Sequence, residues 1–164
     1  MHYLNKQIIK NFEPERAVDL YTIGYEGLSF WSFVRYLRDH NVTTVVDIRE
    51  KPISRKKGFS KSELGQGLAS NHINYIHLQA LGTPKHLRDE LNKTKDYSKF
   101  FKSYDHLLGT KTKYIDEIIK MMIHKRVALV CFEKDASKCH RNAVAQKIRG
   151  TSSRPVDIHH IETL

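Results

Sequence analysis

One segment is most informative about the architecture of this chain: Val127-Ala128-Leu129-Val130-Cys131-Phe132-Glu133-Lys134-Asp135-Ala136-Ser137-Lys138-Cys139-His140-Arg141. It begins as an apolar run of strand length and ends abruptly in charge. Asp135 or Ser137 is then a candidate N-cap for a helix with apolar residues at Val144 and Ile148. A buried strand, a polar loop and a helix are typical of a ligand site in an α/β protein, because the first-turn amides have no partner.

The start of this helix carries Cys139, His140 and Arg141. These supply a nucleophile or ligand, a titrating group and a fixed cation, and a thiol in this setting has a lowered pKa. We therefore expect Cys139 to be reactive and Cys131, inside the strand, to be inert core. The alternative is that Cys139 packs as a small hydrophobe and Arg141 is a solvated surface charge.

Outward from this segment, strands and helices alternate along the chain. Strands are expected at 20–25, 43–49, 74–78, 127–133 and 156–161, and helices after Ser29, after the capping box Ser60-Lys61-Ser62-Glu63, and at about 112–125. Residues 1–19 are interpreted as an appendage to a single domain, 20–164. A lysine- and aromatic-rich insert at 85–112 is expected to form short helices over one edge of the sheet.

This alternation predicts a single-domain α/β fold with a doubly wound, mainly parallel sheet of about five strands and helices on both faces. The simplest strand order is 3-2-1-4-5, which reverses between the first strand and the strand at 127–133. Ligands in such sheets bind at the reversal, beyond the carboxyl ends of the strands. The residues expected there are Gly24, Tyr25, Glu26, Asp47, Arg49, His77, Glu133, Cys139, His140 and Arg141.

Three of these residues have two interpretations each. Asp47 and Arg49 alternate, so both side chains leave the strand on one face. In the first interpretation, Arg49 binds a phosphate at two points, while Asp47 holds Arg49 in place, binds a metal or accepts a proton. In the second, the two side chains form an internal ion pair. Glu133 ends a buried strand, where desolvation would raise its pKa toward that of a general acid or base, or it caps the following turn.

The composition favours an anionic partner. Lys and Arg number 28 against 18 Asp and Glu, a net charge of +10, and nucleic acid is the commonest partner of such a surface. The most basic stretch is 49–61, which includes Arg55. A plain lysine-rich surface is the alternative. No segment reaches the apolar length of a membrane span, the first twenty residues lack the apolar core of a signal peptide, and the two cysteines are typical of cytosolic thiols. We expect a cytoplasmic protein with no membrane partner.

Several known motifs are absent. The glycine-rich dinucleotide and P-loop fingerprints are missing, so no cofactor is indicated. The Cys-x5-Arg spacing of a phosphatase loop fails, because Ser137 and Ala145 stand where the arginine is needed. Zinc binding by Cys139, His140 and a third ligand such as His159 or His160 lacks a short-spaced ligand pair, so no metal is assigned. Nothing indicates an oligomeric state.

Four spaced motifs carry a family resemblance: Thr22-Ile23-Gly24-Tyr25, Asp47-x-Arg49-x-x-Pro52-x-Ser54-Arg55, Tyr75-x-His77-Leu78-x-x-Leu81-Gly82 and Cys131-x-Glu133-x5-Cys139-His140-Arg141. Over roughly 20–161 the chain resembles the domain-of-unknown-function 488 family. It departs at Thr83, where many members have a second glycine, and in the insert at 85–112. The resemblance implies a compact bacterial or archaeal α/β domain whose motif residues gather at one end, and it supplies no reaction.

These observations give one main hypothesis and two alternatives. The first is an enzyme acting on a phosphate-bearing ligand, a nucleotide or a nucleic acid. In it, Arg49, Arg55 and Arg141 bind the anion, and Glu133 or Asp47 transfers a proton or binds a metal. Cys139 and His140 are further catalytic candidates beside these two acids, and the supporting residues are Tyr25, Glu26 and His77. The second is a non-catalytic nucleic-acid-binding module that uses the loop at 49–61 and the insert. The third is a thiol-dependent transferase that uses Cys139.

Overall fold

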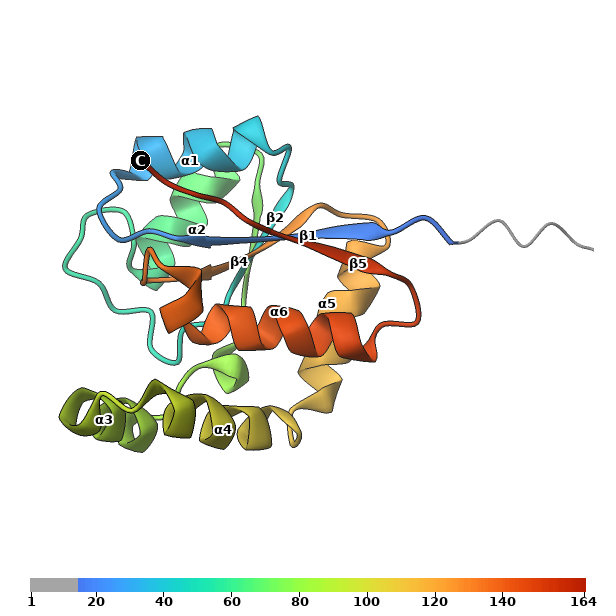
Figure 1. Ribbon diagram of the computed structural model, residues 1–164. Helices are drawn as coiled ribbons and strands as arrows, with labels where there is room; N and C mark the ends of the chain where they lie inside the picture. Colours follow the sequence, from blue (N-terminus) through green and yellow to red (C-terminus); the bar gives the residue numbers. More distant parts are fainter. Residues whose placement is uncertain (1–14) are drawn as a thin grey trace, which may run out of the picture.

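The computed structural model describes residues 15–164 and contains a five-stranded, all-parallel sheet with helices on both faces (Figure 1). The strands are β1 (Val18–Gly24), β2 (Thr44–Asp47), β3 (Asn74–His77), β4 (Val127–Cys131) and β5 (Val156–His160). The predicted α/β class is confirmed, and each expected strand is present within a few residues of its predicted bounds.

The order of the strands is β3-β2-β4-β1-β5, so the predicted order 3-2-1-4-5 is wrong in the position of β4. This strand lies between β2 and β1, pairing Val130 with both Asp47 and Ile23. All five of its residues are buried, because a strand that is apolar on both faces gains most from the centre of a parallel sheet. As a result, the loop after β4 lies between the ends of β1 and β2.

One face of the sheet is covered by α1 (Phe30–Asp39) and α2 (Lys61–Ala69). Ser29 caps α1 by accepting a hydrogen bond from the Ser32 amide at 3.1 Å. The expected capping box of α2 takes a different form. The Ser60 hydroxyl donates to Glu63 Oε2 at 2.7 Å and the Gly58 amide donates to the same oxygen at 3.2 Å, so the box also ties down the preceding loop.

The other face is covered by α5 (Thr112–Met122) and α6 (His140–Thr151), with α3 (Lys85–Thr94) and α4 (Tyr97–Leu108) outside them. The insert therefore packs mainly on α6 instead of over a sheet edge (Figure 1). Its anchor is Tyr104, which is fully buried and donates to the Leu81 carbonyl at 2.5 Å. Two short 3-10 turns, Gln79–Leu81 and Ala136–Lys138, complete the fold.

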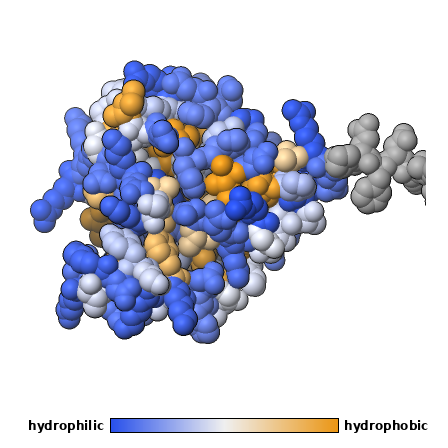
Figure 2. All heavy atoms as spheres, viewed as in Figure 1, coloured by the Kyte–Doolittle hydropathy of each residue, from blue (hydrophilic) through white to orange (hydrophobic). Residues whose placement is uncertain are grey.

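The expected appendage at 1–19 overlaps this fold at its end. Val18 and Asp19 pair with Val156 and Asp157 in β1 and β5, while residues 1–14 lie outside the described part of the chain. No helix within residues 15–164 combines the length and the apolar character needed to cross a bilayer. The face shown in Figure 2 is mostly hydrophilic, with smaller apolar areas across its middle.

Candidate active site at the carboxyl edge of the sheet

The carboxyl ends of β1, β2 and β4 meet at one edge, as expected for a parallel sheet. Gly24 is level with Cys131 across β1 and β4, and Asp47 is level with Val130 across β2 and β4. Gly24 allows the loop after β4 to close over this edge. A Cβ atom there would lie 1.8 Å from the Glu133 carbonyl oxygen, a distance that no other residue type can accommodate.

Asp47 and Arg49 form a buried two-point ion pair at the end of β2. Arg49 Nε donates to Oδ1 at 2.9 Å and Nη2 donates to Oδ2 at 2.6 Å, with the two side chains 8% and 0% exposed. Tyr75 also donates to Oδ2, at 2.7 Å. Of the two interpretations of these residues, the internal ion pair is therefore the one that matches the geometry.

The two Nη1 donors of Arg49 are also used within the protein. Nη1 donates to the Tyr25 hydroxyl at 3.0 Å and to the Phe59 carbonyl at 2.7 Å, and the guanidinium lies over the Tyr25 ring. Burial alone would lower the pKa of Arg49, but the hydrogen bonds and charge of Asp47 raise it above its ordinary value. His77 is 2.8 Å from the Arg49 carbonyl oxygen through Nε2, so it supports the same loop.

A second cluster, called here the four-donor cluster, consists of Cys131, Glu133, Cys139 and His140. One donor atom from each lies within 4.8 Å of the other three. The Cys131 Sγ is 2.6 Å from Glu133 Oε2 and 3.6 Å from His140 Nδ1, and the Cys139 Sγ is 3.9 Å from the same nitrogen. The strand brings Cys131 and Glu133 to one face, and the start of α6 brings the other two residues to meet them.

The pKa values in this cluster differ from the expectations. Burial raises the pKa of the Cys139 thiol well above its ordinary value, where a lowered value was predicted. Burial is the largest single effect on Glu133 and acts to raise its pKa, but the hydrogen bonds from Cys131, the Glu133 amide and Cys139, together with the charge of His140, outweigh it. The net shift is downward, again the opposite of the prediction. For His140, burial is the largest single effect and favours the neutral ring, yet contact with Cys139, the Ile48 carbonyl and the charge of Glu133 together raise the pKa overall.

Arg141 is 1% exposed and does not act as a solvated surface charge. Its Nε donates to Thr22 Oγ1 at 3.2 Å, its Nη2 donates to the Lys134 carbonyl at 2.9 Å, and its Nη1 donates to the Glu133 carbonyl. Arg141 therefore ties the loop after β4 to β1. Glu26 serves the same loop by accepting the Lys134 amide at 2.8 Å.

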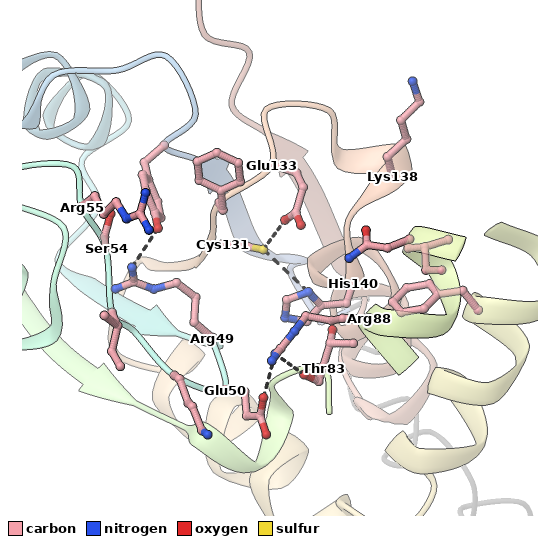
Figure 3. A pocket seen from close by; sticks show the side chains of 17 residues that line it. Arg49, Glu50, Ser54, Arg55, Thr83, Arg88, Cys131, Glu133, Lys138 and His140 are labelled. Carbon is pink, nitrogen blue, oxygen red and sulfur yellow. Dashed lines mark hydrogen bonds and ion pairs between the residues drawn. The ribbon is translucent and has the colours of Figure 1, made fainter. Parts of the chain in front are cut away.

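A pocket of about 540 Å³ opens beside these clusters, and we call it the carboxyl-edge pocket (Figure 3). Its lining residues are Tyr25, Arg49, Glu50, Lys51, Ile53, Ser54, Arg55, Thr83, Arg88, Leu91, Asn92, Phe100, Cys131, Phe132, Glu133, Lys138 and His140. Ser54 and Arg55 lie on one wall, Arg88 and Lys138 lie toward the other, and Cys131 and Glu133 point in between them (Figure 3).

The pocket brings together only some of the predicted site residues. Tyr25, Arg49, Arg55, Glu133 and His140 line it. The predicted residues that do not line it are Glu26, Asp47, His77, Cys139 and Arg141.

Two of the lining residues that the sequence did not predict as site residues are Cys131 and Arg88. Cys131 was interpreted as inert core, although alternation along a strand places it on the same face as Glu133 and would have revealed it. Arg88 comes from α3 in the insert. It donates to Glu50 Oε2 at 2.7 Å and to the Thr83 carbonyl at 2.6 Å, and no local pattern indicates this long-range contact.

A family model with the description "Domain of unknown function DUF488" matches residues 30–148. The chain belongs to this family. The match extends from α1 through most of α6. It includes the Asp47–Arg49 pair, the four-donor cluster and the insert at 85–112. No curated protein and no solved structure matches the chain.

Proposed function

We propose that this DUF488 chain is an enzyme that acts on a phosphate-bearing ligand, a nucleotide or a nucleic acid, in the carboxyl-edge pocket. The observation that carries the proposal is the charge of the lining. Five lining residues are Lys or Arg and two are Glu, around a floor that contains Cys131, Glu133 and His140. A concave site with this balance of charge concentrates anions at the reactive groups.

Of the three arginines expected first to hold the phosphate, only Arg55 is kept. The Arg49 guanidinium makes four hydrogen bonds to protein acceptors and that of Arg141 makes three. Lys51 and Arg55 are exposed on the pocket wall and form no ion pair within residues 15–164. Lys138 makes only a long, exposed contact with Asp135, at 3.8 Å. These three side chains can therefore turn toward a bound phosphate at little cost.

Apolar side chains at the pocket mouth favour a ligand that also carries a flat ring. Ile53 is 84% exposed and Phe132 is 47% exposed, and both line the pocket. Stacking of a base on an aromatic side chain contributes about 1–3 kcal/mol. Phosphate-binding cations next to an exposed aromatic ring are the combination that a nucleotide or a single strand requires.

The reactive floor favours an enzyme over a pure binding module. Charge and stacking alone would serve a binding protein, which has no use for a thiol, a carboxylate and an imidazole beneath its ligand. A thiol-dependent transferase is the second candidate function. It is favoured by the position of Cys131, which lines the pocket in contact with Glu133 and His140, and this geometry replaces Cys139 as the candidate nucleophile.

The binding part of the proposal is tested by titrating the full chain with nucleoside phosphates, single-stranded and duplex nucleic acid at about 50 mM salt and above. Arg55→Gln and Lys51→Gln should each weaken binding, and on duplex DNA each lost phosphate contact should reduce the salt slope by about 0.9. Lys120→Gln, an exposed lysine of α5 that does not line the pocket, is the matched control.

The outcomes separate the candidate functions. Equal affinities for Arg55→Gln and Lys120→Gln would remove the phosphate site. Binding with no chemical change in any ligand would leave a nucleic-acid-binding module. A covalent adduct between the Cys131 sulfur and part of the ligand, detected by mass spectrometry during the reaction, would identify the transferase.

A further inference from the structure

We infer that the four-donor cluster is a zinc site. Its donor set is two thiols, one imidazole and one carboxylate, and these are the groups that bind Zn²⁺ in proteins. The inference stands on the geometry of the cluster and does not depend on the ligand proposed for the pocket.

The distances among the donors fit a tetrahedral ion. Zn–S bonds of about 2.3 Å and Zn–N bonds of about 2.0–2.1 Å place sulfur and nitrogen ligands about 3.6 Å apart. The two observed distances to His140 Nδ1 are 3.6 Å from Cys131 Sγ and 3.9 Å from Cys139 Sγ. The distance of 2.6 Å between Cys131 Sγ and Glu133 Oε2 is shorter than this, and rotation of the Glu133 side chain by about 1 Å at the oxygen corrects it. All four donor atoms lie within 4.8 Å of one another.

The surroundings of His140 prepare its ring for a metal. Its Nε2 is 3.0 Å from the Ile48 carbonyl oxygen, which can only accept a hydrogen bond. The proton of the neutral ring is therefore held on Nε2, and Nδ1 presents its lone pair to the two sulfur atoms. A backbone carbonyl that fixes the far nitrogen is the usual support for a metal-binding histidine.

A second supporting contact reaches Cys139. The Arg141 amide donates to the Cys139 Sγ at 3.4 Å, a hydrogen bond that stabilises a thiolate. Cys139 is 1% exposed, and a buried thiolate needs such a donor and a nearby cation. The Arg141 guanidinium is directed to the carbonyls of Glu133 and Lys134, so a metal ion bound by the four-donor cluster would supply the positive charge beside the Cys139 sulfur.

The two histidines first considered as zinc ligands are occupied elsewhere. His159 Nε2 is 2.8 Å from Asp19 Oδ1, and His160 Nδ1 is 2.7 Å from Thr22 Oγ1, both on the pairing of β5 with β1. Cys131, Glu133 and His140 line the carboxyl-edge pocket, whereas Cys139 does not. A zinc ion held here would be anchored from beneath and would face the pocket.

The test uses the full-length chain purified under reducing conditions. Elemental analysis should give zinc in an amount equal to the protein. After chelation, Co²⁺ should restore the site and produce the charge-transfer band of thiolate ligands together with the visible bands of a tetrahedral ion. Cys139→Ser, Cys131→Ser and His140→Gln should each weaken Co²⁺ binding by at least the 10–100-fold that loss of a supporting contact causes.

Matched controls and a mild variant separate loss of ligands from loss of fold. His159→Gln and His160→Gln should bind Co²⁺ like the wild type. Glu133→Gln leaves the volume of the side chain almost unchanged. It should shift the visible bands of bound Co²⁺, while the circular dichroism spectrum of the protein stays unchanged. A wild-type protein that takes up no zinc and gives only the spectrum of aqueous Co²⁺ would overturn the inference, as would equal effects of the ligand and control variants. Neither result bears on whether Arg55 and Lys51 bind phosphate, which the nucleotide titrations measure separately.

Discussion

The Asp47–Arg49 pair and the four-donor cluster lie at the same edge of the sheet and both are largely buried, yet their interactions are opposite in kind. In the pair, a carboxylate and a guanidinium satisfy each other at two points, and Tyr25 and Tyr75 complete the shell. In the cluster, atoms with lone pairs lie close together and few hydrogen-bond donors lie among them. These atoms belong to Cys131, Glu133, Cys139 and His140. Burial therefore marks structure in the first case and a candidate reactive centre in the second.

The largest effect is expected from breaking the Asp47–Arg49 pair. Asp47→Asn or Arg49→Met should lower the free energy of unfolding by about 3–5 kcal/mol, because each leaves a buried charge without its partner. Urea unfolding measures this cost. The double variant should be less destabilised than the sum of the two single variants, since it removes both charges together.

The exposed pair Lys85–Asp89 on α3 is the control for this prediction. Its side chains are 75% and 48% exposed at an N–O distance of 2.5 Å, and such pairs contribute about 0–1 kcal/mol. If Asp47→Asn costs no more than Asp89→Asn, the pair is not the structural element described here.

The sequence predicted much of this edge because its motifs are local. Periodic apolar residues and Ser29 predicted α1, and alternation predicted that Asp47 and Arg49 share a face. The choice between ligand site and ion pair could not be made, because it depends on Tyr25, Phe59 and Tyr75, which lie far away in the chain.

The predicted strand order was wrong for a similar reason, since it depends on contacts between distant segments. The simplest arrangement was assumed, although a fully apolar strand such as Val127–Cys131 is typical of the centre of a parallel sheet.

The second prediction concerns Arg141, which connects the loop after β4 to β1. Arg141→Met should destabilise the fold by about 1–3 kcal/mol for each acceptor left unpaired. These acceptors are the part-buried carbonyls of Glu133 and Lys134, whereas the Thr22 hydroxyl keeps its contact with His160. Hydrogen exchange should also increase in the loop after β4. Arg149→Met, an exposed arginine on the same helix, should change neither quantity. A result equal to that control would restore Arg141 as a free anion-binding residue.

The third prediction concerns the two thiols in metal-free, reduced protein. Both thiols are buried, but Cys131 should react with a maleimide faster than Cys139, because it lines the pocket whereas burial raises the pKa of Cys139. This reverses the order expected from the sequence, which placed Cys139 at a helix start and Cys131 in a strand interior. Mass spectrometry of Cys139→Ser and Cys131→Ser gives each rate alone. Faster labelling of Cys139 would restore the original expectation.

The smallest effect comes from Glu63, a carboxylate satisfied by hydrogen bonds without burial. The Ser60 hydroxyl and then the Gly58 amide lower the pKa of Glu63 below its ordinary value. Because the folded pKa is depressed, the stability that this group contributes is present above its unfolded pKa and is lost as the pH falls through the folded one. Ser60→Ala should raise the pKa of Glu63 toward its ordinary value and weaken this acid dependence, as an NMR titration measures. Ser62→Ala, exposed on the same turn, should leave the titration of Glu63 unchanged. An unaltered pKa of Glu63 in Ser60→Ala would mean that the Ser60–Glu63 contact does not persist in solution. Hydrogen bonds would then hold a carboxylate in place at this edge only where the group is also buried, as Asp47 is.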